Sequence, residues 1–155
     1  MGREAALALV NNAALLISLT VIYSALYIRF KKEKLLLQKI ISGLLLGVIA
    51  MAVMVDSWEL SPGVVFDTRS VVLGLTGLYF GFIPSIITVI MTSILRILMG
   101  GSGAAVGVSV IICSATTGLL WRYRRRRALH QMTLFELYLF GIVVHIFMMI
   151  GMLFL

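Results

Sequence analysis

The feature that most constrains this chain is the position of its basic residues in an otherwise apolar sequence. Ten of its thirteen Lys and Arg residues fall into two short clusters. The first comprises Arg29, Lys31, Lys32, Lys34 and Lys39, and the second comprises Arg122, Arg124, Arg125, Arg126 and Arg127. Basic clusters beside apolar helices mark the cytoplasmic side of a membrane protein. The clusters therefore predict which ends of the intervening segments face the cytoplasm.

The composition indicates the class of protein. Of the 155 residues, 61% are hydrophobic and 12% are charged, and the mean hydropathy is +1.12. A soluble domain of this size does not need so much apolar surface, so we expect an all-α polytopic membrane protein. The net charge of +7 comes largely from the two clusters. It therefore indicates topology and attraction to anionic membrane lipid, and we expect no nucleic-acid partner.

The residue types also exclude several kinds of site. A single cysteine, Cys113, excludes an internal disulfide and a cysteine metal cage. The two His and six acidic residues are scattered and show no zinc-ligand spacing. The chain has no long polar segment that would form a catalytic domain. We therefore expect a protein that is not an enzyme and that needs no cofactor or metal.

The apolar segments predict six transmembrane helices in one domain, residues 1–155. The stretch 70–99 suits either one long tilted helix or two short helices. If both basic clusters are cytoplasmic, an even number of crossings separates them, which favours two helices paired as a hairpin. We place the break at Gly81-Phe82-Ile83-Pro84, because Pro begins helices well and ends them badly. The expected helices span about residues 5–28, 35–55, 70–82, 84–99, 104–121 and 133–155.

Two features complete the expected architecture. The segment 56–68 is expected to be an outer loop with a turn at Pro62-Gly63. Small residues recur at helical spacing, as in the pair Gly43 and Gly47, and such stripes let helix backbones approach closely in lipid. We interpret the stripes as packing surfaces within the bundle, with homodimerisation as the alternative.

Two arginines depart from the charge pattern, because Arg69 and Arg96 lie on the outer side at the edges of apolar segments. They are 27 residues apart (96 − 69), and their midpoint of 82.5 coincides with the predicted turn. We therefore expect them to face each other at equal depth. Two like charges at one depth repel unless a negative group lies between them. Either they extend separately to the lipid headgroups, or they bind an anion together.

Other groups of positive partial charge point to the same place. The helices expected at 70–82 and 104–121 both begin on the outer side, with free N–H groups there. A glycine turn precedes the second helix and can aim backbone N–H groups at an anion. We therefore predict a bidentate site for a carboxylate or small phosphate. Asp67 is either the counter-charge or the cap of the helix that follows it. The candidate residues are Arg69, Arg96, Asp67, Gly100, Gly101, Ser102, and the (i, i+4) pair Ser109 and Cys113.

These residues also resemble a known family. The matching motifs are Phe66-Asp67-Thr68-Arg69-Ser70, Gly74-Leu75, Gly81-Phe82-Ile83-Pro84, and Arg96 followed by Gly100-Gly101-Ser102-Gly103. Together they resemble the LytS/YhcK-type transmembrane sensor domain of bacterial sensor histidine kinases and diguanylate cyclases. The resemblance covers roughly residues 35–155. The family is in turn similar to the six-helix substrate-binding subunits of energy-coupling-factor vitamin transporters.

The resemblance implies a multi-pass sensory module of the bacterial cytoplasmic membrane. Some members respond to carboxylates such as pyruvate, and others are linked to cell-wall control. The implied partners are a small anionic ligand and a cytoplasmic kinase or cyclase output domain. Arg69 and Arg96 are the implied ligand contacts, and Ser109, Cys113 and Ser114 are the nearest matches to the Ser and Cys of family sites.

Two other functions remain open, a substrate-binding subunit of a transporter and a small assembly protein. Six helices leave the end of the chain outside, whereas an output domain must be cytoplasmic. We therefore expect this sequence to be a fragment of a longer receptor.

Overall fold

The computed structural model describes residues 35–55, 58–61, 64–66, 69–101, 103–125 and 132–153, together with residues 10, 14 and 17. This part of the chain is helical apart from one short β-hairpin, which agrees with the predicted class. The helix expected at 5–28 lies outside the described residues except at those three positions. In chain order the elements are α2 (Leu35–Val55), β1 (Trp58–Ser61), β2 (Val64–Phe66), α3 (Arg69–Leu75), η2 (Thr76–Phe80), α4 (Phe82–Met99), α5 (Ala104–Arg124) and α6 (Leu134–Leu153).

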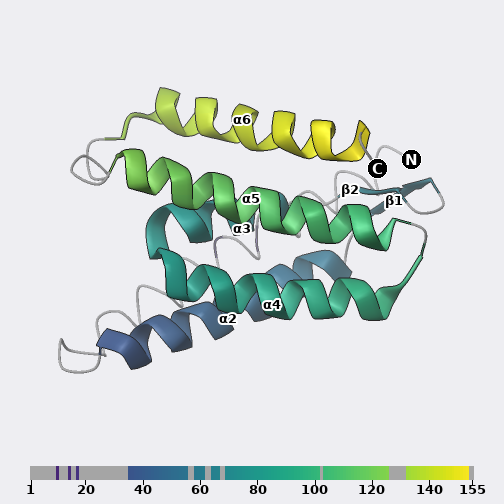
Figure 1. Ribbon diagram of the computed structural model, residues 1–155, viewed down its shortest axis with the longest axis horizontal. Coiled ribbons are helices and arrows are strands. Elements are labelled where there is room, and N and C mark those ends of the chain that lie inside the picture. The colour runs from purple at the N-terminus through teal and green to yellow at the C-terminus, as the bar shows by residue number, and fades with distance from the viewer. Residues whose placement is uncertain are drawn as a thin grey trace.

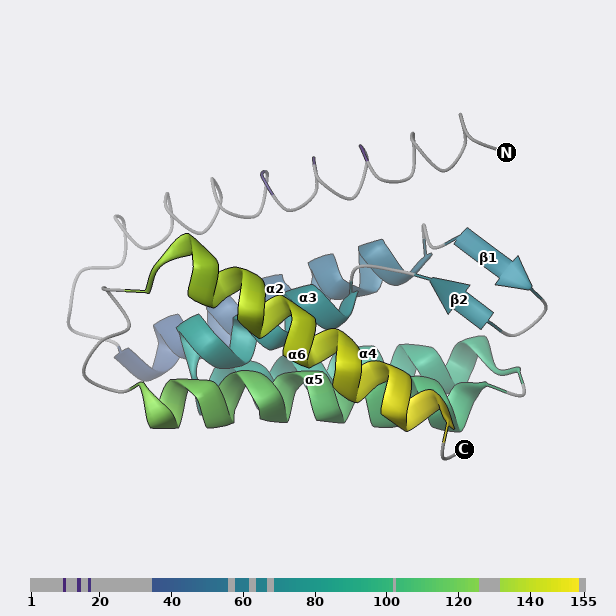
Figure 2. The ribbon, with the colours of Figure 1, turned by 90° about the horizontal axis from the view of Figure 1, so that it is seen from above.

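Within this part of the chain, three helices are long and apolar enough to cross a membrane, namely α2, α4 and α5. The helices run back and forth along one bundle, so that α2 begins and α5 ends at the same end (Figure 1). We call this end the basic end, because its described basic residues are Lys39, Arg122, Arg124 and Arg125. The opposite end, where β1 and β2 lie, is called the hairpin end. Helix α6 crosses over α5 at an angle (Figure 2).

The turn between α3 and α4 forms where the sequence predicts it, but it is tighter than expected. The last residues before the turn form the π-helix η2, and the turn itself is the single residue Gly81, with φ 86°. This positive φ strains any residue with a side chain, so glycine suits the position. Helix α4 then begins at Phe82 rather than at Pro84. Pro84 fits in the first turn of α4, where its missing N–H leaves no hydrogen bond unmade.

A residue of the second basic cluster closes this turn. The Nη1 atom of Arg122 donates to the carbonyl oxygens of Leu78 and Tyr79, at 3.0 and 2.7 Å. These carbonyls belong to the C-terminal end of η2, which lacks onward helical partners. The guanidinium also lies beside Gly81, where an added Cβ would be 3.3 Å from Nε. Arg122 therefore has a structural role that its place in a charge cluster does not reveal.

Glycines set the distance between the helices, as the small-residue stripes predict. At Gly77 an added Cβ would lie 2.6 Å from the carbonyl oxygen of Ala115, and at Gly118 it would overlap the carbonyl oxygen of Gly74. Helix α3, η2 and α5 are therefore in direct backbone contact. Gly43 similarly accommodates Pro84 of α4, with 3.0 Å from an added Cβ to Cα. These glycines serve packing within one chain.

The segment 56–68, expected to be a loop, contains the antiparallel strands β1 and β2. The Cα register pairs Trp58 with Phe66, Glu59 with Val65 and Ser61 with Val64. The signal was present, because Val64, Val65 and Phe66 are good strand formers and Pro62-Gly63 is a turn-forming pair. The strands are three and four residues long, which is too short for a period-2 pattern to stand out.

Candidate ligand site at the hairpin end

Arg69 is the first residue of α3 and is 5% exposed. The side chain therefore lies inside the protein and does not extend over the surface of the bundle. It enters the bundle directly after the β-hairpin, which lies at this end of the molecule (Figure 2). The burial favours the anion-binding interpretation over separate contacts with lipid headgroups, because a headgroup contact requires an exposed guanidinium.

Arg96 lies in the last turn of α4 and is 6% exposed. Its Nη1 atom donates to the carbonyl oxygen of Gly100 at 3.0 Å, and its Nε atom is buried with no acceptor. Among the described residues Arg96 forms no ion pair. A positive charge at the C-terminal end of a helix is favourable, but the dipole is worth only about 0.3–1 kcal/mol at exposed sites and up to about 2 kcal/mol when partly buried. A buried guanidinium with an unused donor is therefore undercompensated.

Gly107 provides the space for the Arg96 side chain. An added Cβ at Gly107 would lie 2.9 Å from Cδ of Arg96 and would overlap its Nε. The guanidinium thus lies against the backbone of α5, near the start of that helix. The burial of Arg96 follows from the glycine opposite it, and this pairing joins the end of α4 to the start of α5.

The two arginines are separated from the turn by similar numbers of residues. Arg69 precedes the turn residue Gly81 by 12 residues, and Arg96 follows it by 15. Five of the residues before the turn form the π-helix η2, so the α-helical rise of about 1.5 Å per residue applies to the interval after the turn and not to the whole interval before it. The symmetry expected from the midpoint at 82.5 is therefore approximate, because the turn lies at residue 81.

The glycine turn has the expected conformation, but its N–H groups are partly used. Gly100 and Gly101 have φ values of 68° and 87°, and an added Cβ at either would meet no described residue within 4 Å. The N–H of Gly100 donates to Ile97, and that of Ala104 donates to Gly101, at 3.1 and 3.2 Å. The contribution of this turn is therefore open space and the carbonyl that holds Arg96. Asp67 and Ser102, the other two predicted polar groups, lie outside the described residues.

The structure does not bring Ser109 and Cys113 to the arginines. The buried face of α5 is centred on Gly107, and a helix rotates by about 100° per residue. Ser109 and Cys113 therefore point roughly 160° and 120° away from that face. The hydroxyl of Ser109 donates to the carbonyl of Val106 at 2.8 Å, and Cys113 lines a cavity between α5 and α6. The polar residues on the buried face of α5 are Ser114 and Thr117, which are 2% and 9% exposed.

Sequence reasoning missed two further polar features. Ser70, next to Arg69, is 1% exposed, and its Oγ is buried without a hydrogen-bond partner. On α4 the hydroxyl residues Ser85, Thr88 and Thr92 are buried on the same face as Arg96. Their spacing of three and four residues was readable as one helical face. Each hydroxyl donates a hydrogen bond to the carbonyl oxygen four residues earlier in α4. The donors of these three residues are therefore already used, whereas Arg96 on the same face keeps an unused donor.

Comparison with known proteins agrees with the motif resemblance. The family model described as 5TMR of 5TMR-LYT matches residues 20–155, which is most of the chain. Searches of the curated proteins and of the solved structures found no match. The match includes both buried arginines, the turn at Gly81 and the glycines after α4. The chain therefore belongs to the 5TMR-LYT family, the transmembrane sensor domain of LytS-type kinases.

Proposed function

We propose that this chain is a sensory input module that binds a small carboxylate, such as pyruvate, between Arg69 and Arg96. The observation that carries the proposal is the environment of Arg96, a guanidinium 6% exposed with a buried Nε donor and no acceptor for it. Removing a charge from water costs several kcal/mol unless a partner compensates for it. A carboxylate entering this site would supply the opposite charge and the missing acceptor.

The neighbouring groups support a ligand larger than a simple anion. Ser70 is adjacent to Arg69, and its hydroxyl is buried without a partner. A 2-oxo acid carries a carbonyl oxygen beside its carboxylate, so the hydroxyl and a guanidinium would be satisfied together. No described residue lies within 4 Å of a Cβ added at Gly100 or Gly101, which supports entry of the ligand from the hairpin end.

The proposal includes a direction in the membrane. Six crossings of the bacterial inner membrane, with both basic clusters in the cytoplasm, would place the hairpin end outside. The bundle would then resemble the energy-coupling-factor substrate-binding subunits. The ligand would join the starts of α3 and α5 to the end of α4, and a change in their packing would pass to a cytoplasmic kinase or cyclase output domain. The module itself would act by binding and not by catalysis.

Titration of the purified chain with pyruvate tests the proposal. A hydrogen bond to a charged group is worth about 1.5–3 kcal/mol, so Arg96→Ala should weaken binding by roughly 10- to 150-fold. Arg96→Lys should restore only part of the loss, because an ammonium cannot make a two-pronged contact. Lys39→Gln removes one charge at the basic end and should leave the affinity unchanged. Equal affinity of the wild type and Arg96→Ala would show that the carboxylate binds elsewhere.

A further inference from the structure

A second site of a different kind lies between α5 and α6, toward the basic end. It is a cavity of about 540 Å³ whose lining includes Cys113, Thr117 and Trp121 of α5 and Val143 and Phe147 of α6. It does not overlap the arginine pair at the hairpin end. Its volume falls in the range of pockets that hold small molecules, roughly 300–1,000 Å³.

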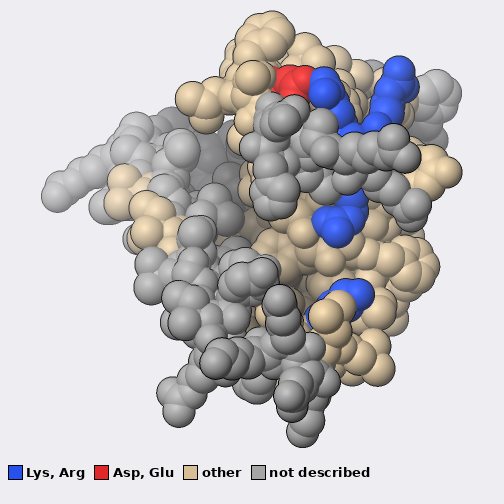
Figure 3. Space-filling view, turned by 90° about the vertical axis from the view of Figure 1, so that its left-hand side faces the viewer, with Lys and Arg blue, Asp and Glu red and all other residues tan. Residues whose placement is uncertain are grey.

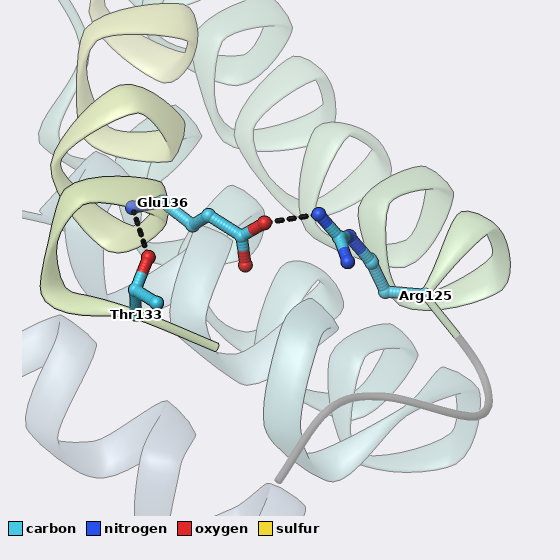
Figure 4. Close-up of polar contacts among 3 residues, drawn as sticks. All are labelled: Arg125, Thr133 and Glu136. Atoms are coloured by element: carbon cyan, nitrogen blue, oxygen red, sulfur yellow. Dashed lines mark hydrogen bonds and ion pairs between the residues drawn. The ribbon is translucent and has the colours of Figure 1, made fainter. Parts of the chain in front are cut away.

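One end of this cavity is positively charged. Arg124 and Arg125 contribute to the lining, and both are exposed. The guanidinium of Arg125 is paired with Glu136, which Thr133 positions by accepting a hydrogen bond from the Glu136 N–H at 3.3 Å (Figure 4). Arg124 forms no ion pair among the described residues. The end-on view shows Lys and Arg gathered here with one small acidic area (Figure 3). The charge available to a ligand is therefore that of Arg124.

A second donor in the cavity lining also lacks an acceptor. The indole Nε1 of Trp121 is buried and has no hydrogen-bond partner, although its ring packs edge-on against Phe140 with centroids 5.6 Å apart. An indole N–H can only donate. Arg124 and Trp121 are three residues apart, and this spacing places them on neighbouring positions of one helix face. An acceptor-rich anion at this point would satisfy both donors.

The rest of the cavity is apolar and open toward the surface of the bundle. Leu120 is 69% exposed and Phe147 49% exposed, and both contribute to the lining together with Val143. From Arg124 the lining continues to Cys113, 11 residues earlier on α5, a length of roughly 16 Å. A ligand that fits has an anionic head beside Arg124 and an apolar tail along α5 and α6. A membrane supplies such a molecule at high local concentration.

We propose that this cavity binds one anionic phospholipid, its phosphate held by Arg124 and the Trp121 N–H and an acyl chain lying against Leu120, Val143 and Phe147. Basic pockets between transmembrane helices on the cytoplasmic side bind anionic headgroups in this manner. The lipid fills the space between α5 and α6 and ties the basic end to one leaflet. This site is independent of the carboxylate site, and neither requires the other.

Native mass spectrometry of the full chain in detergent tests the lipid site, with phosphatidylglycerol and phosphatidylcholine of identical acyl chains as probes. We expect the wild type to retain phosphatidylglycerol about tenfold more tightly than phosphatidylcholine, because phosphatidylcholine carries the same phosphate but adds a choline cation that would lie near Arg124 and offset its attraction. Arg124→Gln should remove this preference. Trp121→Phe keeps the aromatic ring and should weaken phosphatidylglycerol several-fold. Lys39→Gln, a basic-end residue outside the cavity lining, should change nothing.

Several outcomes would overturn the proposal. Equal retention of the two lipids by the wild type would show that the net charge of the headgroup does not contribute to binding. An equal loss in Arg124→Gln and Lys39→Gln would indicate general surface charge instead of a site. Competition by inorganic phosphate at equal concentration would assign the site to a free anion and not to a lipid. Should Arg124→Gln fail to fold, Val143→Trp tests the apolar half, because it fills the cavity and should lower retention of both lipids.

Discussion

The two ends of the bundle both carry arginines, and the arginines have different roles at each end. At the hairpin end Arg69 and Arg96 are buried, at 5% and 6% exposure. At the basic end the described residues Arg124 and Arg125 are exposed, whereas Arg122 is bound to backbone carbonyls, those of Leu78 and Tyr79. The difference arises from the neighbouring backbone, because Gly107 leaves the space in which the Arg96 side chain lies against α5. Burial, and not charge alone, therefore separates these two groups of arginines, and the burial of Arg69 and Arg96 is what supports the proposed ligand contacts.

The largest effect is expected from a change at the backbone contact between α3 and α5. In Gly118→Ala the new Cβ would overlap the carbonyl oxygen of Gly74 and lie 3.0 Å from the Leu78 nitrogen, both of them backbone atoms that cannot move aside. Overpacking costs typically about 1–3 kcal/mol, which outweighs the gain of up to about 1 kcal/mol from helix propensity. We expect a loss of about 2 kcal/mol or more in the free energy of unfolding, measured by SDS titration.

Gly141→Ala is the matched control for this change. Among the described residues, nothing lies within 4 Å of an added Cβ at Gly141 in α6. The substitution should therefore stabilise the protein by about 0.5–1 kcal/mol, the usual gain from replacing a glycine inside a helix. A destabilisation equal to that of Gly118→Ala would show that the bundle tolerates no change at any glycine, and the specific contact between α3 and α5 would lose its support.

Gly107→Ala is expected to weaken ligand binding at the hairpin end without changing lipid binding at the basic end. The atoms that it displaces are Cδ and Nε of Arg96, which belong to a flexible side chain. The fold should survive, with a change in unfolding free energy of about 1 kcal/mol, the low end of the cost of overpacking. The guanidinium must move, so the affinity for pyruvate should fall by about tenfold, as for loss of one charge-assisted hydrogen bond. Retention of phosphatidylglycerol at the basic end should not change. A parallel loss of lipid binding would show that the two sites are not independent.

The sequence could predict the helical class, the turn near residue 81 and the pair of arginines, because hydropathy, charge parity and spacing are local signals. It could not predict that the turn is one residue long, since this depends on a π-helix whose carbonyls Arg122 satisfies from another helix. It also could not show which face of α5 carries Ser109 and Cys113. Their helical face is set by which side of α5 packs on α4, and that choice depends on Gly107 and Gly118 meeting their partners.

Arg122→Gln tests whether a charge-cluster residue can be structural. The shorter amide cannot reach both the Leu78 and Tyr79 carbonyls, which accept hydrogen bonds from Arg122 at 3.0 and 2.7 Å. One contact is part-buried and the other is exposed, so their loss should cost about 1 kcal/mol of unfolding free energy or somewhat more, the net worth of a typical hydrogen bond. Lys39→Gln removes the same charge from the same end and should cost less than about 0.5 kcal/mol. Equal effects of the two changes would show that Arg122 contributes its charge to topology and that its hydrogen bonds to the turn do not stabilise the fold.

The smallest effect is expected at the ion pair between Arg125 and Glu136, which joins α5 to α6 at the basic end. The two side chains are 45% and 23% exposed, so water screens their attraction. Exposed pairs contribute about 0.2–1 kcal/mol, and a double-mutant cycle with Arg125→Gln and Glu136→Gln should give a coupling energy in that range. Raising the salt concentration should lower it further. A coupling above about 2 kcal/mol would mean that this pair is shielded from water. The basic end would then not be the solvated end of the bundle, and its contrast with the buried hairpin end would be wrong.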